Sequence, residues 1–411
     1  KIFLKYPGKS IRFKHVLGGG GKGQRVVKSV EEVHEAVKSV LIESKTNGVG
    51  ENKNFLIELN IENSRHVEIQ LIGNGKWCVE LGGRDCSLQM HEQKLVEISL
   101  TDEMLESSAK EYEKLGKNTQ ANILRNDANQ LKTMCLEAKK FGEELNLDSV
   151  STFECIVDKE KHYFMEVNTR IQVEHRVTEM AYKLKFTNPN DPSDTFFVNS
   201  LVAAMILINC YGDILPLPER EPNSISGIEA RINSTNTSLT PHSDGTILEW
   251  SKPIEQEIRD DQGIGISNYF TGFSQPYRLS GAYDSNIALS VTRGGSRKES
   301  FEKITEILRK MEVRGKDLNL NINFLYGMLN WFIVNDAMLK PNTNFVSSYL
   351  ALAGKIKLLS NLINFDIAWA YQLSKAKKKY GIIIEQVFEQ KLTLLLRPLK
   401  ILFGDIHLLM G

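Results

Sequence analysis

Hydrophobic and polar positions alternate along several short segments of the chain, a pattern that is typical of β-strands. Residues 11–16 and 26–27 carry this pattern on either side of a run of glycines, which predicts two strands joined by a glycine loop. Residues 66–72 also alternate and are followed by a Gly-Asn-Gly turn. They are therefore predicted to form a hairpin with residues 77–81.

Longer stretches with apolar residues three or four positions apart predict helices. The longest covers residues 102–146 and is expected to break near Gly116. Another is expected to begin at about Ser29, which would act as its N-cap. Further helices are predicted for residues 197–211, 299–312, 321–336 and 344–411, and strands for residues 54–59, 151–157, 162–166, 228–232, 246–250 and 287–291.

Two segments interrupt these elements. Residues 186–196 are rich in Asn, Pro, Asp and Ser, which indicates a loop or an insertion. The run Pro-Leu-Pro at 216–218 indicates a domain boundary. Because strands and helices are mixed along the chain, the sequence predicts an α+β or α/β multidomain enzyme.

Composition narrows the class of protein. The 411 residues are enough for two or three domains, and the 51 basic and 51 acidic residues argue against a nucleic-acid binder, which needs excess positive charge. No segment approaches the roughly 18 apolar residues of a membrane span. The five cysteines are scattered without a CxxC pair, so we expect a reducing compartment and no zinc ribbon. Because the chain begins with Lys1, we expect its natural N-terminus to be missing.

Four glycines at residues 18–21 are followed by Lys22 and Gly23. Successive glycines expose backbone N–H groups that can surround phosphate oxygens. Lys14, near the end of the preceding strand, and Lys22 add positive charge beside them. The run has neither the GxxxxGK[ST] nor the GxGxxG pattern. The residues alone therefore leave open a mobile phosphate-binding lid and a flexible surface turn.

Acidic and amide side chains gather on the two later strands. Glu166, Asn168 and Arg170 are two residues apart, so on an extended chain they point to the same face. With Glu154 they form an oxygen-rich face that suits Mg²⁺, or Mn²⁺ in its place. Arg170 can hold a small planar anion, and Glu174 is placed to act as a base on it. A solvated face with cross-strand ion pairs is the alternative.

Several segments occur in a fixed order along the chain: Lys14 with the glycine run, then residues 62–70, 84–89, 93–97, 166–175, 229–233 and 283–285. Together they resemble the signature of biotin carboxylases, the ATP-grasp component of biotin-dependent acyl-CoA carboxylases. The resemblance covers roughly residues 11–335. Its most specific part is Glu-Val-Asn-Thr-Arg-Ile-Gln-Val-Glu-His at 166–175.

The resemblance implies a role for each matching residue. Lys14 and the loop of Gly19, Gly20 and Gly21 would hold the ATP phosphates; Glu58 and Ile61 would lie beside adenine; His66 and Gln89 would contact the nucleotide; Glu154, Glu166 and Asn168 would bind the metal ion; Lys94, Arg170 and Glu174 would bind bicarbonate, with Glu174 as base; and Arg231 would stabilise the biotin enolate.

The resemblance also implies a domain plan. An α+β chain is expected, with an ATP-grasp lid at residues 1–58 and an ATP-grasp central domain at 59–215, which carries an insertion near 182–197. The C-terminal domain of biotin carboxylases would cover residues 216–340, and a helical linker or coupling segment residues 341–411. The family's N-terminal domain is expected to be missing. The insertion resembles that of long-chain acyl-CoA carboxylases.

The implied reaction has two steps. Bicarbonate attacks the γ-phosphate of ATP to give carboxyphosphate, which breaks to CO₂ and phosphate. Phosphate then takes a proton from biotin, and the resulting enolate captures CO₂. The implied partners are a carrier domain that bears biotin and a carboxyltransferase, within a homo-oligomer in the cytoplasm or, in a eukaryote, the mitochondrial matrix. Neither nucleic acid nor membrane is an expected partner.

Some positions depart from the family pattern. Glu92 stands where histidine or asparagine is usual, Leu59-Asn60 replaces a basic-aromatic pair, and no Met-Lys-Met biotinylation site is present. Two alternatives remain: another ATP-grasp ligase of the carbamoyl-phosphate type, and a non-catalytic structural subunit. Residues 170–175 together with Arg231 argue against the first. The intact set of charged site residues argues against the second.

Overall fold

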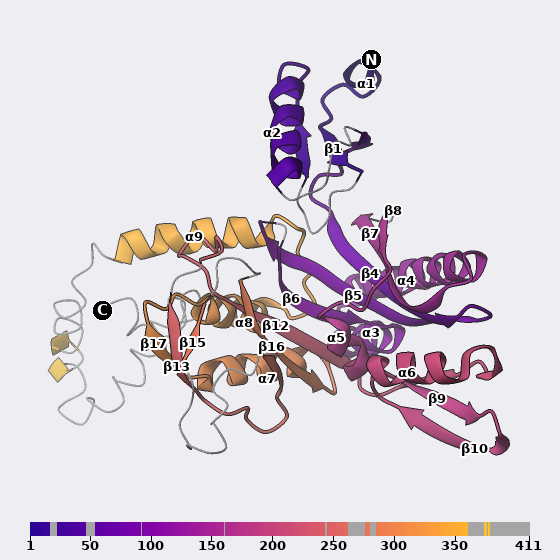
Figure 1. The fold of residues 1–411 in the computed structure, drawn as a ribbon. Helices are drawn as coiled ribbons and strands as arrows, with labels where there is room; N and C mark the ends of the chain where they lie inside the picture. Colours follow the sequence, from indigo (N-terminus) through magenta and orange to yellow (C-terminus); the bar gives the residue numbers. More distant parts are fainter. Residues whose placement is uncertain are drawn as a thin grey trace.

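The computed structural model describes residues 1–16, 23–46, 54–91, 93–159, 161–242, 245–261, 276–279, 285–360, 374–375 and 377–378. These residues form four β-sheets with flanking helices (Figure 1). The expectations for Gly19, Gly20 and Gly21, for Glu92, for residues 283–284 and, in the predicted helical tail, for residues 361–373, 376 and 379–411 lie outside the described residues.

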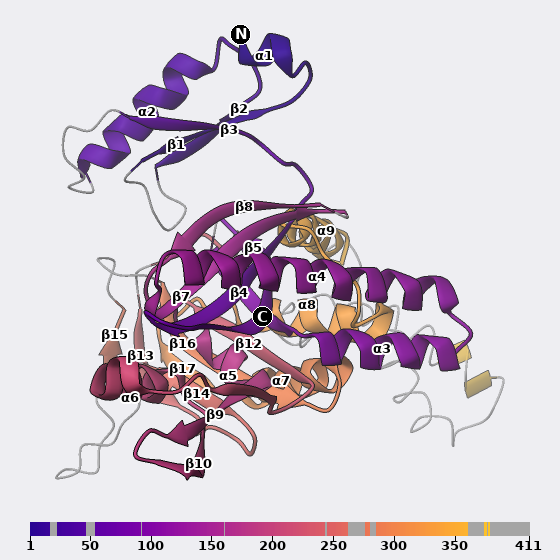
Figure 2. The same ribbon diagram turned by 90° about the vertical axis from the view of Figure 1, so that its right-hand side faces the viewer.

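A small N-terminal unit stands above the largest sheet in both ribbon views (Figures 1 and 2). Its strands follow the order β2-β1-β3, and the predicted pair of strands on either side of the glycine run is confirmed. Ile11, Phe13 and Val27 form its buried core. Its elements are α1 (Ile2–Lys5), β1 (Ile11–His15), β2 (Gln24–Val27), α2 (Val33–Thr46) and β3 (Phe55–Leu59).

Helix α2 begins at Val33, so the expected start at Ser29 was wrong. The Glu32 carboxylate accepts a hydrogen bond from the backbone N–H of Lys28 at 2.8 Å, and the N–H of Val33 donates to the carbonyl of Val30 at 3.2 Å. These two bonds close a turn over the residues that were expected to form the first helical turn. Glu32 therefore stabilises a turn before α2 and is not part of the helix.

The largest sheet has eight strands in the order β14-β16-β12-β6-β5-β4-β7-β8, and every neighbouring pair is antiparallel. The predicted hairpin of β4 with β5 is confirmed, and the two strands predicted at residues 151–157 and 162–166 pair with each other as β7 and β8. The strands are β4 (Arg65–Asn74), β5 (Cys78–Met90), β6 (Gln93–Leu100), β7 (Asp148–Asp158), β8 (Lys161–Asn168), β12 (Ser226–Asn233), β14 (Ile258–Asp261) and β16 (Asn286–Gly294).

The two faces of this sheet differ in chemistry although both are buried. On β4, Val67, Ile69 and Leu71 face the helices α3 (Asp102–Lys114) and α4 (Asn118–Glu144). The alternate residues His66, Glu68 and Gln70 point to the opposite face and are also buried. The predicted break between the two helices near Gly116 is confirmed. A buried face made of polar side chains requires partners for every one of them.

Strand β12 joins the later half of the chain to the earlier half. Ile228 of β12 lies opposite Ile98 of β6, so the sheet continues across the boundary expected at residue 216. Ile228, Ala230 and Ile232 pack on the core under α7 (Arg297–Lys310) and α8 (Ile322–Asn335). The alternate residues of β12 therefore point to the same face as Glu68.

Residues 186–196 were expected to form a loop or an insertion; they form part of a hairpin, so the loop interpretation was wrong, whereas the insertion stays a prediction. Strands β9 (Tyr182–Asn188) and β10 (Asp191–Val198) pair antiparallel, with Phe186 buried and stacked on Phe196. The Asn, Pro and Asp residues that suggested a loop supply the turn instead, where Asn188 accepts a hydrogen bond from the N–H of Asn190 at 3.0 Å.

The following helix α6 (Leu201–Tyr211) begins four residues later than predicted. Ser200 is its N-cap and accepts a hydrogen bond from the N–H of Ala203, which fixes the start. The remaining elements are α5 (His175–Ala181), the 3₁₀ turn η1 (Gly212–Ile214), β11 (Glu219–Pro222), β13 (Thr246–Trp250), β15 (Tyr277–Arg278), β17 (Val313–Lys316) and α9 (Phe345–Ser360). Among the helices described, none is long and apolar enough to span a membrane.

The contact of β12 with β6 makes a testable contribution to stability. We expect Ile228→Ala to lower the free energy of unfolding by about 2–5 kcal/mol, because Ile228 is fully buried in the shared core. Val202→Ala, on the outer side of α6, is the control and should change it by less than about 0.5 kcal/mol. Urea unfolding measures the free energy for both variants. Equal losses in the two would show that burial of Ile228 at the junction of β6 and β12 does not contribute to stability.

Candidate active site

Three side chains from distant parts of the chain meet on the polar face of the large sheet. Lys94 of β6 forms an ion pair with Glu174, which directly precedes α5. Arg231 of β12 donates from Nη2 to the other Glu174 oxygen at 3.0 Å. Lys94 and Arg231 each keep 12% of their side chain exposed, so both cations remain open to a ligand.

A close backbone approach places Glu174 there. Helix α5 lies across β12, and a Cβ atom at Gly227 would be 2.7 Å from the Cβ of Met180. Glycine at this position therefore lets the helix settle on the sheet. Glu174 makes no capping bond to α5 with its side chain, which leaves both carboxylate oxygens to Lys94 and Arg231.

Arg84 of β5 is the centre of the buried polar face, with no exposed side-chain surface. It donates from Nε to Glu68 Oε1 at 2.7 Å and from Nη1 to Gln70 Oε1 at 2.8 Å. It also donates to Thr178 of α5 at 2.7 Å and to Gln172 at 2.9 Å. One guanidinium thus ties β4, β5 and α5 together.

Carboxylates and cations are connected by ion pairs across this face. Lys94 donates to the second oxygen of Glu68 at 2.7 Å, and Arg231 donates to Glu97 Oε1 from Nε at 2.9 Å and from Nη2 at 2.6 Å. We call the connected set the charge ladder, and it consists of Glu68, Arg84, Lys94, Glu97, Glu174, Glu229 and Arg231.

The carboxylates of the charge ladder differ in protonation. Burial disfavours ionisation of Glu68, but the adjacent Arg84 and Lys94 hold its pKa below the ordinary value. Burial acts in the same way on Glu174, yet Lys94 and Arg231 keep its pKa low as well. Burial raises the pKa of Glu97 to about 7, because Arg231 offsets only part of the cost and Glu174 adds repulsion.

Glu154 lies at the other end of the polar face. Its Oε1 accepts hydrogen bonds from Asn168 at 2.6 Å and from Gln172 at 3.0 Å, and its Oε2 lies 2.9 Å from His66 Nε2. Glu166 stands opposite Glu154 across β7 and β8 and forms an ion pair with Lys14 of β1. Lys14 therefore links the N-terminal unit to the oxygen-rich strands.

This end of the face fits a magnesium ion by its donors. Glu154 and Glu166 contribute carboxylates from directly opposed positions, and Asn168 adds an amide on the same strand as Glu166. These are the hard oxygen ligands that Mg²⁺ takes together with water and phosphate. Glu68 lies nearby, but Arg84 and Lys94 already occupy both of its oxygens.

Other predicted residues are not members of the charge ladder. Arg170 follows the end of β8, is exposed and donates to the carbonyl of Ile171 at 3.2 Å, so it does not continue the strand face as expected. Gln89 lies opposite Lys94 in the pairing of β5 and β6. Glu58 lies on β3 opposite Arg12, and Ile61 follows that strand, accepting a hydrogen bond from Ser64 at its carbonyl.

Sequence reasoning gave no role to Glu68, Arg84, Glu97, Gln172 or Glu229, although the resemblance covered the segments that carry them. A signal was present in β12, where Glu229 and Arg231 are two residues apart and so point to the same face. For the others the sequence did not show which strands are neighbours.

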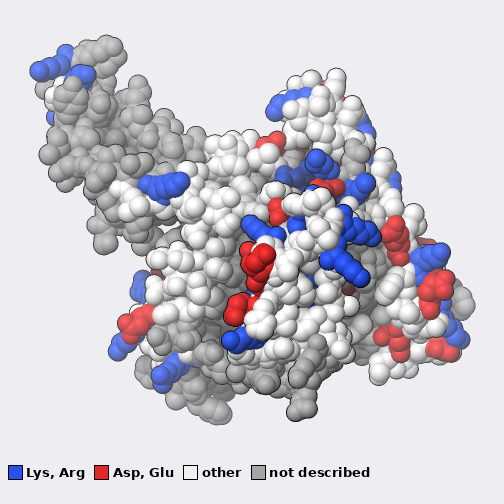
Figure 3. Space-filling view, turned by 90° about the horizontal axis from the view of Figure 1, so that it is seen from above, with Lys and Arg blue, Asp and Glu red and all other residues white. Residues whose placement is uncertain are grey.

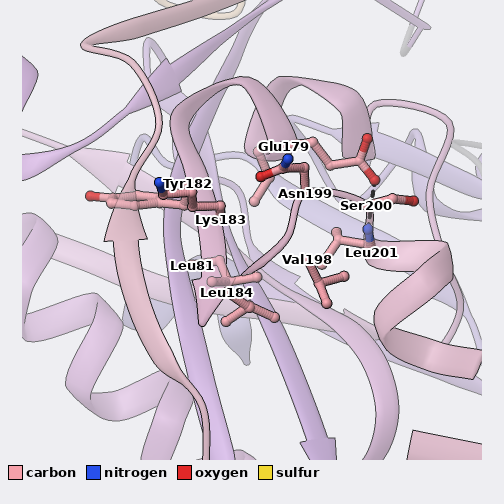
Figure 4. A pocket seen from close by; sticks show the side chains of 10 residues that line it. Leu81, Glu179, Tyr182, Lys183, Leu184, Val198, Asn199, Ser200 and Leu201 are labelled. Atoms are coloured by element: carbon pink, nitrogen blue, oxygen red, sulfur yellow. Dashed lines mark hydrogen bonds between the residues drawn. The ribbon is translucent and has the colours of Figure 1, made fainter. Parts of the chain in front are cut away.

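A pocket lies at the start of α6 beside the β9–β10 hairpin (Figure 4). It encloses about 220 Å³, part of it open to solvent, between Tyr182, Leu184 and Leu201. The carboxylate of Glu179 accepts a hydrogen bond from the N–H of Leu201 at 2.7 Å and also pairs with Arg176. Its acidic group is thus engaged in holding the helix start, and the pocket is not the candidate active site.

The surface carries both signs of charge. On the face seen from above, Lys and Arg side chains are interspersed with Asp and Glu among the described residues (Figure 3). A mixed surface of this kind fits the equal totals of 51 basic and 51 acidic residues.

Comparison with known proteins agrees with this geometry. Residues 5–126 and 121–187 match the family described as "Carbamoyl-phosphate synthase L chain, ATP binding domain". A biotin carboxylase of Halalkalibacterium halodurans is 29% identical over 349 residues, which cover 84% of this chain and 65% of that protein. The mitochondrial methylcrotonoyl-CoA carboxylase subunit alpha of Glycine max is 30% identical over 354 residues, which cover 84% of this chain and 40% of that protein. The chain therefore spans less than two thirds of either relative.

A solved structure shares the fold. The biotin carboxylase domain of Hydrogenobacter thermophilus 2-oxoglutarate carboxylase, in complex with MgADP, ADP and bicarbonate, superposes with a TM-score of 0.65 at 26% identity. The likeness covers 85% of this chain and 66% of that one. The α+β architecture expected from the sequence is therefore confirmed as that of biotin carboxylases, with an ATP-grasp fold.

Removing Arg84 tests whether the buried face depends on it. We expect Arg84→Met to lower the free energy of unfolding by about 3–5 kcal/mol, because Glu68 would keep a buried charge with one partner fewer. Arg125→Met is the control: Arg125 pairs with two glutamates in water, and its loss should change stability far less. A stability loss no larger for Arg84→Met than for the control in urea unfolding would contradict the role of Arg84 as centre.

Proposed function

The chain belongs to the biotin carboxylase family of ATP-grasp proteins, and on that premise we propose that it uses ATP and bicarbonate to carboxylate biotin. The observation that carries the proposal is the meeting of Lys94, Glu174 and Arg231 on one face. Two cations with 12% of their side chains exposed flank an ionised carboxylate. Such a site can hold a small anion beside a base.

Different residues of the polar face would bind the nucleotide with its metal ion and bicarbonate. Glu154, Glu166 and Asn168 lie at the end nearest the N-terminal unit, from which Lys14 reaches Glu166. Together they would hold ATP phosphates and magnesium. When bound, magnesium would neutralise charge on the phosphates and polarise the transferring phosphoryl group. The charge ladder begins beside these residues, where Glu68 lies opposite Glu154, and reaches the junction of β6 and β12. Bicarbonate would lie against Lys94, which pairs with both Glu68 and Glu174.

Glu174 is suited to take a proton. Its lowered pKa keeps it ionised at neutral pH, because Lys94 and Arg231 lie beside it. When a bicarbonate oxygen attacks the γ-phosphate of ATP, the hydroxyl proton of bicarbonate can pass to Glu174. The products of that step are ADP and carboxyphosphate. Arg231 would face the negative charge that biotin develops when it loses its own proton.

The proposal extends to the partners and the activity of the whole protein. A carrier domain bearing biotin and a carboxyltransferase would be its partners, as the names of the related carboxylases suggest, and the complete enzyme would be an acyl-CoA carboxylase. The five cysteines are free, four of them buried, which supports a reducing compartment such as the cytoplasm or the mitochondrial matrix. Assembly as a homo-oligomer is part of the same proposal.

The alternative of a carbamoyl-phosphate ligase shares the oxygen-rich strands and is consistent with the family match. The observation against it is the contact of Arg231 with Glu174 and Glu97. That contact brings a residue of the later half of the chain into the charge ladder, beside the position proposed for bicarbonate. Such a residue is needed for a second substrate that receives CO₂ there.

Substitution of the two central residues tests the proposal. In the full-length protein, Glu174→Gln should lower biotin-dependent ATP hydrolysis by about 100-fold to 10,000-fold, because the base is lost. Arg231→Ala should lower it by about 100-fold to 1,000-fold, because charge on biotin is no longer stabilised. Phosphate release in the presence of bicarbonate and free biotin is the measurement.

Glu249→Gln is the matched control, since Glu249 is exposed and lies on β13 away from the polar face. Its rate should stay at the level of the unsubstituted protein. Hydrolysis that ignores both bicarbonate and biotin, or that survives both substitutions, would overturn the proposed function.

A further inference from the structure

Glu97 and Glu229 stand directly opposite each other on neighbouring strands. Glu97 lies on β6 and Glu229 on β12, paired in register, and both are fully buried. Directly opposed residues of an antiparallel pair have their Cβ atoms about 4.5–5.5 Å apart. Two carboxylates at that spacing repel each other strongly unless one of them is neutral.

The two carboxylates have little to bind. Arg231 donates twice to Glu97 Oε1, at 2.9 and 2.6 Å, but its Nε is 3.7 Å from Glu229 Oε1, beyond hydrogen-bond range. Glu97 Oε2 and both oxygens of Glu229 have no hydrogen-bond partner among the described residues. Three buried carboxylate oxygens in one place therefore lack donors.

Within the part of the chain that the structure describes, the surrounding charges supply no further cation for these oxygens. Lys94 of β6 is taken by Glu68 and Glu174, and Arg84 of β5 by Glu68. The thiol of Cys86 on β5 lies within 4.8 Å of carboxylate oxygens of Glu68 and Glu97, and burial raises its pKa, so it adds no positive charge. Arg176 of α5 pairs with Glu179 and with Asp260 of β14. The charge ladder thus holds four carboxylates, Glu68, Glu97, Glu174 and Glu229, against the three cations Arg84, Lys94 and Arg231. One negative charge is left over.

We infer that Glu97 and Glu229 share one proton, and that this carboxyl–carboxylate pair is a positioning device for Arg231. A protonated Glu229 can donate a hydrogen bond to Glu97 Oε2, so that each of these two carboxyl groups gains a partner. Glu97 Oε1 then stays free to accept from Arg231. The inference rests on the proposed function, because Arg231 is the residue assigned there to face biotin.

The shared proton also sets the charge of the site. With it, the charge ladder is neutral, and an anion such as bicarbonate can approach Lys94 and Arg231 without net repulsion. Without it, three ionised carboxylates surround Arg231, which weakens its pull on any other anion. In line with this, burial raises the pKa of Glu229 well above its ordinary value, and Glu97 adds to the rise.

Thermal unfolding of the full-length protein tests the shared proton without reference to activity. A carboxyl group with a raised pKa in the folded state contributes stability that is present below about pH 4.3 and is lost as the pH rises through the folded value, about 7 for Glu97. E229Q removes this loss, because its amide donates to Glu97 and does not ionise. The Tm of E229Q minus the Tm of the unsubstituted protein should therefore be about 2–4 °C larger at pH 8 than at pH 5.

E257Q is the matched control. Glu257 is a buried carboxylate that has its own cation, since Arg259 donates to it at 2.8 Å and Ser290 at 3.2 Å. Its replacement should lower Tm at both pH values. If E229Q behaves like E257Q and loses the same number of degrees at pH 5 and pH 8, Glu229 is an ionised partner of Arg231 and the inference is wrong.

Infrared spectroscopy gives a second measurement that needs no variant to fold. The unsubstituted protein at pH 6 should show the carbonyl stretch of a buried carboxylic acid, which disappears on titration to alkaline pH. Absence of that band at pH 6 would overturn the inference.

The rate of biotin-dependent hydrolysis separates this inference from the proposed function. For the unsubstituted protein, kcat/KM for biotin should fall as the pH rises above about 7, whereas E229Q should hold its value within about threefold. A protein without biotin-dependent activity but with the expected Tm pattern would keep the shared proton and lose the proposed function. A parallel alkaline fall in both proteins would remove the role of the pair in positioning Arg231.

Discussion

Balance of buried charge is the constraint on which the structure depends. The polar face of the large sheet is covered, so each carboxylate needs a cation or a proton, and each cation needs an acceptor. Arg84 meets this demand for β4 and β5, and Arg231 for β6 and β12. Arg84 also donates to Thr178 of α5, and Arg231 also donates to Glu174. Removal of either guanidinium group therefore leaves a buried carboxylate with one cation fewer.

That constraint explains why the site forms where it does. The apolar faces of β4 and β12 pack against α3, α4, α7 and α8, so their polar residues have only the opposite face to occupy. Helix α5 covers that face, and its approach over Gly227 closes it. Lys94 and Arg231 are the charge-ladder cations that keep some exposure, and a substrate anion would meet them first.

Much of the fold could be predicted from sequence, because the period of two in β4 and β12 and the turn after residue 72 are local signals. The β9–β10 hairpin was missed because its turn residues dominate the composition of a short segment. Lys94, Glu174 and Arg231 were named through resemblance, whereas Arg84, Glu97 and Glu229 were not. Their importance follows from strand neighbours such as β6 and β12, which are far apart in the chain and whose pairing no local pattern shows.

The most direct test traces whether an oxygen atom of bicarbonate is transferred to the released phosphate. If bicarbonate held beside Lys94 and Glu174 attacks the γ-phosphate, one bicarbonate oxygen must remain on the phosphate when carboxyphosphate breaks to CO₂. With ¹⁸O-labelled bicarbonate, ATP and free biotin, mass spectrometry of the released phosphate should therefore find one labelled oxygen per phosphate, and carboxybiotin should form in the same reaction. Phosphate that takes its new oxygen from water instead would contradict the account.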